Sequence, residues 1–348
     1  MLPPVSASSG PGSVRRRPAT MEDVARVAGV SPQTVSRVVN ARAYVGGDTR
    51  ERVLTAMREL NYRPNPAAQA LVTGRSKTLG VISTDSVAFG PSSVLLALAR
   101  AAHARGYFVS IARLASLDRG SLSQALEQLQ RQSVEGILLN AGQDGITNEL
   151  DRRLLDVPVV AIEDTPDARV PIVAVDQVAG AAAATRLLLE LGHHSVSHIA
   201  GPRDWSAARR RIEGWCAVLE SAGVRVAPPL FGDWSVQSGY ELGRVLARDR
   251  DVTAIFAAND EMALGVMRAM YEAGREVPRE VSIAGFDDVP FARYLAPSLT
   301  TVRQDFQAIG RRAIDLVTAT LDGSTTNVPL LPPELIVRDS TATYEENR

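Results

Sequence analysis

Five polar side chains that can hydrogen bond to DNA bases lie within one short segment of this 348-residue chain: Gln33, Thr34, Ser36, Arg37 and Asn40. A glutamine can form two hydrogen bonds with adenine, and an arginine can form two with guanine. These five residues are left to face outward if the valines of the same segment face inward on a helix. The segment therefore favours a helix that presents polar groups to the major groove of DNA.

The surrounding residues predict an earlier helix and a tight turn between the two helices. Thr20 can cap the first helix, with Asp23 as its reciprocal partner three residues later. Gly29 lies in the turn, where a positive φ costs little only for glycine. Ser31 can cap the second helix, and Pro32 suits its first position. A helix-turn-helix places its second helix in the groove; an ordinary helical hairpin with a polar outer face is the alternative.

Two further helices are predicted before residue 77. Apolar residues at helical spacing, among them Val53 and Leu54, predict one helix over about residues 48–60 and a small core beneath it. Residues 66–74 then predict a helix of two turns that Gly74 ends. So short a helix is marginal alone in water.

Buried strand patterns alternate with helical patterns from residue 77 onward. The alternation indicates two successive α/β lobes, each with a doubly wound parallel sheet. Ligands of such sheets bind at the carboxyl ends of the strands. The predicted strands are residues 78–83, 107–112, 136–140 and 157–162 in the first series, and residues 172–176, 196–201, 254–259 and 281–287 in the second.

Polar residues that could bind a small molecule follow several of these strands. Thr84, Glu163, Asn259 and Asp287 come after strand ends, and Arg211 lies in a helix that follows another strand. Carboxylates and amides can bind vicinal hydroxyls, and a guanidinium donates a planar pair of N–H groups to adjacent oxygens. These side chains favour a sugar ligand, although Asp287 could instead simply cap the next segment.

The sequence predicts no catalysis, no cofactor and no metal site. No nucleophile elbow or glycine-rich phosphate loop accompanies the carboxylates, and no dinucleotide motif follows the first strand of either lobe. Cys216 is the only cysteine. His193, His194 and His198 lie close together in the sequence, but their spacing matches no familiar metal-ligand pattern.

The formal net charge of −1 hides an asymmetry along the chain. Residues 1–75 contain 11 arginines and five acidic residues, whereas the remainder contains 27 basic and 34 acidic residues. This distribution suits a phosphate-binding head on a body that binds a small molecule. Residues 1–19 predict a disordered basic tail, or alternatively a flexible arm that contacts phosphates. They lack the apolar region of a secretory signal, and no stretch is apolar enough for a membrane span, so a cytoplasmic protein is expected.

Segments along most of the chain resemble the lactose-repressor (LacI/GalR) family of transcriptional regulators, which includes galactose and purine repressors. Several of its motifs occur here in order and at the right spacing, so the resemblance is specific, and it covers roughly residues 18–342. The matching segments are VARVAGVSPQTVSRVVN (24–40), TRERVLTAMRELNYRPN (49–65), AAQALVTGRS (67–76), GPRDWSAARRRIEGW (201–215), GDWSVQSGY (232–240), AANDEMALG (257–265), GFDDVP (285–290) and LTTVRQDFQAIG (299–310).

The resemblance implies an all-α helix-turn-helix headpiece and a hinge helix, joined to an α/β core like that of periplasmic binding proteins. Its two doubly wound lobes would be joined by three crossings and enclose a ligand cleft. The expected parts are a tail (1–19), a headpiece (20–64), a hinge helix and linker (65–76), a core (77–342) and a second tail (343–348). Within the core, the expected N-lobe is about 77–175 plus 306–333, and the C-lobe is about 176–305 plus 334–342.

The resemblance also implies roles for individual residues. Leu71 would wedge between base steps at the minor groove, Trp234 would pack on the apolar face of a sugar ring, and Phe306 would form a second apolar wall. The implied DNA-contact residues are Pro32, Gln33, Thr34, Ser36, Arg37, Asn40, Thr49, Tyr62, Asn65, Ala68 and Leu71. The implied effector-contact residues are Thr84, Glu163, Arg211, Trp234, Asn259, Asp287, Gln304 and Phe306.

The function implied is that of a homodimeric, DNA-binding repressor of carbohydrate-utilisation genes, which a sugar such as a galactoside releases from a pseudo-palindromic operator. The alternatives are a transport-type sugar-binding protein without DNA activity, an enzyme on the same fold, and a related regulator that a purine corepresses. Pro32 stands where the lactose repressor has a tyrosine, so the operator is expected to differ at the base read there. Ala88 is smaller than the apolar residue of the lactose repressor, which implies either a roomier pocket or one shaped for another sugar. The chain ends without a leucine heptad, and this favours a dimer over a tetramer.

Overall fold

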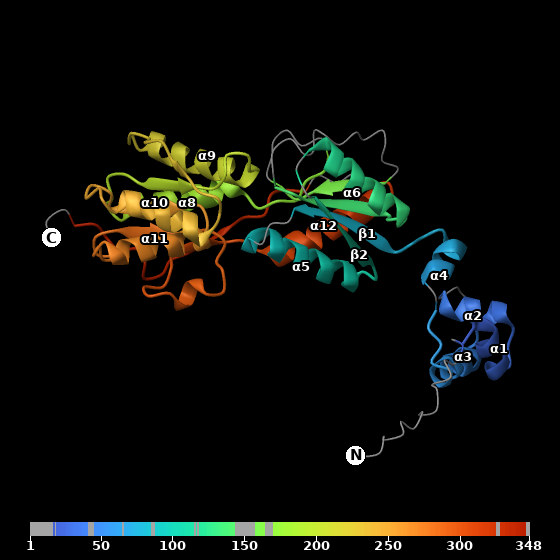
Figure 1. The fold of residues 1–348 in the computed structure, drawn as a ribbon. Helices are drawn as coiled ribbons and strands as arrows, with labels where there is room; N and C mark the ends of the chain where they lie inside the picture. Colours follow the sequence, from blue (N-terminus) through green and yellow to red (C-terminus); the bar gives the residue numbers. More distant parts are fainter. Residues whose placement is uncertain are drawn as a thin grey trace, which may run out of the picture. The chain divides into compact units, whose positions relative to one another are not determined.

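The chain divides into two compact units, Met1–Ser76 and Lys77–Arg348, whose elements are labelled in Figure 1. No helix among the described residues is long and apolar enough to cross a membrane. The computed structural model describes residues 17, 19–40, 45–64, 66–84, 88–114, 116, 118–142, 157–163, 170–324 and 328–345.

The first unit contains the predicted helix-turn-helix, formed by α1 (Met21–Ala28) and α2 (Pro32–Val39). The Thr20 hydroxyl accepts a hydrogen bond from the Asp23 backbone N–H, and the Asp23 carboxylate accepts one from the Thr20 N–H at 3.0 Å. Gly29 has a φ of +65° in the turn. The predicted capping box and turn are therefore confirmed.

Helix α3 (Gly47–Glu59) packs on α1 and α2 over a small core. Val24, Val35 and Val53 are fully buried there. The prediction that Leu54 joins this core was wrong, because Leu54 is 43% exposed. Leu54 follows the buried Val53 by about 100° of helical rotation, which turns it away from the partner helices.

Helix α4 (Pro66–Thr73) is the short helix expected after the headpiece. Gly74 follows with a φ of +68°, and its N–H donates to the Ala70 carbonyl oxygen at 2.8 Å. This left-handed residue ends the helix as glycine commonly does. Leu71 is 88% exposed, so α4 carries a large apolar side chain that the first unit does not bury.

The first lobe of the second unit is a parallel sheet with helices on both faces. The order of its strands is β2-β1-β3-β4, and alternate residues of one strand pack on opposite faces. Leu138 contacts the α5/α12 side, whereas Ile137 and Leu139 contact the α6 side. The elements are β1 (Thr78–Thr84), α5 (Phe89–Ala104), β2 (Phe108–Leu114), α6 (Arg119–Arg131), β3 (Gly136–Asn140), β4 (Val159–Ala161) and α12 (Phe306–Leu321).

The second lobe repeats this arrangement with the strand order β6-β5-β7-β8. Helices α8 and α9 cover one face and α10 and α11 the other, with Phe256 and Ile255 of one strand pointing to opposite sides. The elements are α8 (Gln177–Glu190), β5 (Ser197–Ala200), α9 (Ser206–Ser221), β6 (Leu230–Phe231), α10 (Val236–Leu246), β7 (Ala254–Ala257), α11 (Asp260–Glu272), β8 (Ser282–Ala284) and the 3-10 helix η2 (Ala292–Tyr294).

Three crossings of the chain join the two lobes. The first lies between Val175 and the start of α8 at Gln177, and the other two carry β9 (Thr301–Arg303) and β10 (Glu334–Ile336), which pair antiparallel. The prediction that residues 172–176 form the first strand of the second lobe was wrong. Single bridges from Ile172 to Ala161 and from Val175 to Leu331 attach this segment to the first lobe, so its apolar alternation marks an edge of that lobe.

Candidate functional site

The outer face of α2 carries the residues predicted to contact DNA bases. Gln33, Ser36, Arg37 and Asn40 recur at the three- and four-residue spacing that places side chains on one face of a helix. Gln33 and Arg37 are exposed. Neither side chain forms a hydrogen bond with another residue in the described part of the chain. Their donors and acceptors are therefore available to a partner.

The remaining residues that were predicted to contact DNA differ in their solvent exposure. Pro32 is exposed and Thr34 is partly buried beside Ser31, whose hydroxyl accepts from the Thr34 N–H at 3.2 Å and caps α2. Thr49 lies partly buried in the first turn of α3. Tyr62 packs against the headpiece core, and burial raises the pKa of its phenol.

Two of these predicted contacts lie on α4, and a third falls outside the described residues. Ala68 and Leu71 are both exposed on this helix. Asn65 directly precedes it and is not among the described residues. These two exposed side chains of α4 are small or apolar, and Leu71 is of the type that inserts as a wedge between base steps in the minor groove.

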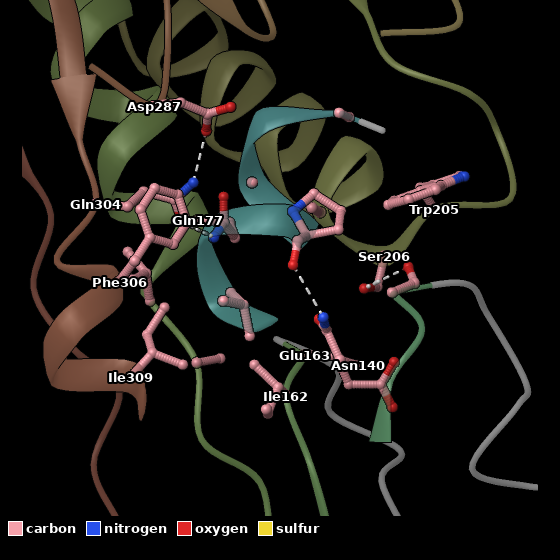
Figure 2. A pocket seen from close by; sticks show the side chains of 18 of the residues that line it. Asn140, Ile162, Glu163, Gln177, Trp205, Ser206, Asp287, Gln304, Phe306 and Ile309 are labelled. Atoms are coloured by element: carbon pink, nitrogen blue, oxygen red, sulfur yellow. Dashed lines mark hydrogen bonds between the residues drawn. The ribbon is translucent and has the colours of Figure 1, made fainter. Parts of the chain in front are cut away.

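A pocket lies between the two lobes, at the carboxyl ends of both sheets, and Figure 2 shows its lining. All eight predicted effector-contact residues line it, although they come from seven different segments of the chain. The pocket has further polar and aromatic lining residues that the sequence analysis did not identify: Asn140, Gln177, Trp205 and Ser206. The eight residues are Thr84, Glu163, Arg211, Trp234, Asn259, Asp287, Gln304 and Phe306.

Arg211 and Asp287 form a buried ion pair at one side of the pocket, with Nη2 of Arg211 3.4 Å from Oδ1 of Asp287. Both residues are less than 10% exposed. Burial lowers the pKa of the Arg211 guanidinium, and the Asp287 carboxylate opposes this change. Burial likewise raises the pKa of Asp287 against the opposing effect of Arg211. Each charge therefore depends on the other for its stability inside the protein.

Two glutamines complete a closed hydrogen-bonded ring with this pair. Gln177 Oε1 accepts from Arg211 Nε at 2.8 Å, and Gln177 Nε2 donates to Gln304 Oε1 at 2.9 Å. Gln304 Nε2 then donates to Asp287 Oδ1 at 2.6 Å (Figure 2). The ring fixes which atom of each amide faces which neighbour. Gln177 directly follows the α8 cap Asp176, and no signal in the sequence separates it from an ordinary first-turn residue.

Trp234 forms an apolar wall of the pocket and is only 8% exposed. Its ring packs so closely on the end of β5 that a Cβ at Gly201 would lie 2.2 Å from it. Its backbone φ is +74°, which few large residues adopt. The indole Nε1 is buried and has no hydrogen-bond partner among the residues that the structure describes. A buried N–H of this kind is costly unless something accepts from it.

Asn259 holds this wall in place and also caps a helix. Its Oδ1 accepts from the Met262 N–H at 2.9 Å at the start of α11, and its Nδ2 donates to the Trp234 carbonyl oxygen at 3.0 Å. The amide therefore has both structural partners before any ligand binds. Asp287 caps no helix; its φ of +108° places its carboxylate in the pocket instead.

The first lobe contributes the opposite walls of the pocket. Phe306 contacts Phe89 edge to face, with ring centroids 5.7 Å apart. Glu163 is buried after β4, and Thr84 ends β1 with a buried hydroxyl that bonds to no described residue. Ala88 lines the same region next to the start of α5. The pocket thus combines aromatic surface with acidic, amide and hydroxyl groups.

This combination suits a polyhydroxylated ring rather than an ion or a metal. Carboxylate and amide groups can bind hydroxyls in the ring plane, while aromatic faces cover C–H groups. Among the described residues, no group of His, Cys, Asp or Glu side chains is arranged to hold a metal ion. His198 lies inside β5, where its Nδ1 is 2.8 Å from the Phe256 carbonyl oxygen and burial lowers its pKa to about 4.

Comparisons with known proteins match both parts of the chain. Residues 20–65 match the model of the bacterial regulatory proteins of the lacI family, and residues 185–341 match that of a periplasmic binding protein-like domain. The lactose operon repressor of Klebsiella pneumoniae is 35% identical, covering 93% of each chain. The HTH-type transcriptional repressor PurR of Haemophilus influenzae is 33% identical, covering 92% of this chain and 98% of its own.

A solved structure extends this similarity to the whole fold. The lac repressor dimer bound to operator and the anti-inducer ONPF superposes with a TM-score of 0.86 at 32% identity, covering 94% of this chain and 100% of its own. The matched relatives are transcriptional repressors rather than enzymes. With a helix-turn-helix and a two-lobed core of this kind, the chain belongs to the LacI family of bacterial regulatory proteins, as a DNA-binding transcriptional repressor.

Proposed function

We propose that this repressor controls carbohydrate-utilisation genes and that a saccharide releases it from a pseudo-palindromic operator. The observation that carries the proposal is the interlobe pocket, in which Trp234 and Phe306 provide apolar walls beside the ion pair of Arg211 and Asp287. A sugar ring presents hydroxyls at its edge and C–H groups on its faces. The pocket offers a complementary surface to both.

On the DNA side, we assign base recognition to the exposed face of α2. Gln33 and Arg37 carry donors and acceptors that match adenine and guanine in the major groove. Two copies of this face read two half-sites when the protein is a dimer, so the operator mirrors the twofold symmetry of the protein. Leu71, exposed on α4, is assigned to the central minor groove, where apolar wedges kink DNA.

Release follows from coupling between the pocket and the DNA-binding head. A sugar that contacts both lobes favours one arrangement of the lobes, and the hinge helices then lose the pairing that orders them on DNA. By linkage, operator DNA must weaken sugar binding by the same factor as sugar weakens operator binding. Equal factors at equilibrium are therefore a requirement of the proposal.

A repressor of chromosomal operators acts in the cytoplasm, and we therefore assign this protein to that compartment. We assign residues 20–64 to the headpiece, 65–76 to the hinge and linker, and 77–342 to the core that binds the effector and dimerises. A transport-type sugar-binding protein would have the core without the headpiece. A purine-type corepressed regulator is the second candidate, since PurR is among the relatives. The large indole wall and the buried carboxylates favour a saccharide.

The test measures fluorescence anisotropy of a labelled duplex from the region upstream of the protein's own coding sequence. The full chain is titrated in moderate salt, with and without galactosides, glucosides and purines. A saccharide that lowers operator affinity by about tenfold or more, roughly 1.4 kcal/mol of coupling, supports the proposal. A purine that raises operator affinity, with no response to any sugar, would overturn it in favour of the corepressed alternative.

As a matched control, Trp234→Ala is expected to abolish the sugar response while operator binding survives. If the duplex does not bind above nonspecific background, selection from random sequences supplies the operator for the same titration. Retained induction by the Trp234→Ala variant would place the effector elsewhere in the protein.

A further inference from the structure

Trp205 lines the same pocket as Trp234, but neither the DNA-binding role nor the proposed binding of one sugar ring uses it. The two indoles meet edge to face, with ring centroids 5.8 Å apart and an interplanar angle of 73°. Trp234 is buried, whereas Trp205 is only half-buried. The pair therefore forms an aromatic corner with one inner wall and one wall nearer the solvent.

Trp205 occupies a position where local helix chemistry would favour a different residue. It is the N-cap of α9 and makes no capping hydrogen bond. Aspartate, serine or asparagine caps α6, α8, α10, α11 and α12 through its side chain. Tryptophan cannot satisfy the free N–H groups of a helix start. Departures from such local rules concentrate at functional sites.

The first lobe holds Trp205 in its position. The Ser206 N–H and hydroxyl both donate to the Gly142 carbonyl oxygen, at 3.0 and 3.2 Å. Gly142 has a φ of +57°, and a Cβ there would lie 3.1 Å from Cζ3 of Trp205. The indole thus rests on the backbone that follows β3, so contacts with both lobes set its orientation.

Trp205 and the buried ion pair lie on different sides of the pocket. In the view of Figure 2, Trp205 and Ser206 lie away from Asp287 and Gln304. Asn140 and Glu163, at the ends of the neighbouring strands β3 and β4, line the space from the first lobe. Trp234 is adjacent to both sides, with its ring centroid 5.5 Å from Cζ of Arg211 and 5.8 Å from the Trp205 ring.

We propose that Trp205 is a specificity-determining residue that binds a second sugar ring, and that the effector is a saccharide of at least two rings. This inference rests on the proposed sugar-responsive function and names the class of sugar. The first ring binds at the ion pair against Trp234. The second stacks on the half-buried face of Trp205, with Asn140 and Glu163 as partners for its hydroxyls.

The test compares monosaccharides with their disaccharides as releasing agents for the operator-bound full chain. The probes are glucose with cellobiose, galactose with galactobiose, xylose with xylobiose and mannose with mannobiose. At least one disaccharide is expected to release the operator at about one tenth of the concentration that its monosaccharide needs. Trp205→Ala is expected to abolish most of this difference by weakening the disaccharide alone, and Trp205→Phe is expected to restore it.

Controls separate this inference from the proposed function and from a folding defect. Unchanged operator affinity of Trp205→Ala without sugar shows that the variant is folded. Trp234→Ala is expected to abolish the response to monosaccharide and disaccharide alike. Two results would contradict a binding site for a second ring while still supporting a sugar effector. One is a set of monosaccharides that release the operator at the same concentrations as their disaccharides, and the other is an equal loss of response to monosaccharide and disaccharide in Trp205→Ala. If no sugar acts on the wild type, the proposed function itself fails and the inference fails with it.

Discussion

The recognition face of α2 and the interlobe pocket present their polar groups in opposite ways. Gln33 and Arg37 belong to one eight-residue helix and are exposed before any partner binds. Arg211 and Asp287 are 76 residues apart in the chain, buried, and already bonded to one another and to two glutamines. The first surface depends on local helix geometry, whereas the second depends on the assembly of two sheets.

This difference determines what each surface can tolerate. An exposed side chain on α2 can be replaced without leaving a buried partner unpaired, so substitutions there change recognition more than stability. A buried charge in the pocket supports the fold and the ligand at once, so its loss affects both. The four predictions below test this contrast, from the largest expected effect to the smallest.

Replacing Asp287 with asparagine is expected to give the largest effect. Removing one partner of a buried ion pair costs about 3–5 kcal/mol, because the Arg211 guanidinium remains buried without a counter-charge. Asparagine also tolerates a positive φ, so the backbone at +108° does not confound the result. Urea unfolding of the full chain measures the loss. The exposed pair of Arg268 and Glu272 provides the control, and a Glu272→Gln variant that costs as much would contradict the argument.

The contribution of His198 to the stability of the core is expected to fall as the pH drops from about 6.5 to about 4, against the opposite contributions of Asp260 and Asp287, whose pKa values burial raises. Burial lowers the pKa of His198 to about 4, so in this interval the unfolded chain binds a proton that the folded core does not. The difference between this pKa and the ordinary histidine value of 6.5 corresponds to a loss of about 3 kcal/mol in the free energy of unfolding at pH 4. His193, also lowered to about 4 by burial, adds to the same slope.

The headpiece provides the contrast, because residues 1–76 contain no histidine. Chemical unfolding across this pH interval, followed separately for the two units, measures the two slopes. A His198→Gln variant is expected to reduce the slope of the core, whereas His103→Gln, on an exposed part of α5, serves as the control. Equal slopes for His198→Gln and the wild type would contradict the assignment.

Arg37→Ala is expected to weaken operator binding by about 1–3 kcal/mol and to relax specificity at one base pair. The arginine is exposed on α2 and forms no bond that supports the fold, so thermal stability is expected to stay constant. Anisotropy titrations against a set of single-base operator variants provide the measurement. Arg58→Ala on α3 is the control. An equal loss on every sequence would show that Arg37 contacts phosphate instead of a base.

Ser31→Ala is expected to have the smallest effect, a loss of about 1 kcal/mol in headpiece stability. The hydroxyl of Ser31 caps α2 by accepting from the Thr34 N–H at 3.2 Å. Alanine removes this bond and leaves the N–H with the Ser31 backbone carbonyl oxygen alone, at 2.9 Å. Thermal unfolding of the full chain, followed in the headpiece transition, measures it. Ser31→Asn keeps a capping oxygen and should lose much less stability. Equal losses of stability in both variants would show that the side-chain cap does not stabilise the headpiece.

The headpiece could be predicted closely from the sequence because its signals are local. Thr20, Gly29, Ser31 and Pro32 each act within three or four residues of their own position, and the structure places each as expected. Leu54 was misplaced for the same reason. Helical spacing alone cannot say how wide the buried face is when only three small helices share a core.

The pocket could be predicted only in part, because its assembly is not local. Strand ends and the family resemblance identified Arg211, Asp287 and Trp234, but Gln177 follows a helix cap and carries no distinguishing pattern. Trp205 had a usable signal: it lies five residues after the end of β5, among other residues at strand ends. Residues 172–176 show the converse error, since strand-like alternation says nothing about which sheet a segment joins.

The close packing of Trp234 on Gly201 also constrains the history of this pocket. A β-carbon at position 201 would lie 2.2 Å from the indole as it now lies, so a side chain introduced there must displace the ring unless the tryptophan is removed first. Replacing Trp234 by a smaller residue frees position 201, but a side chain then placed at 201 occupies the space that the indole needs. The order of these two substitutions makes loss of the wall easier to reach than its recovery.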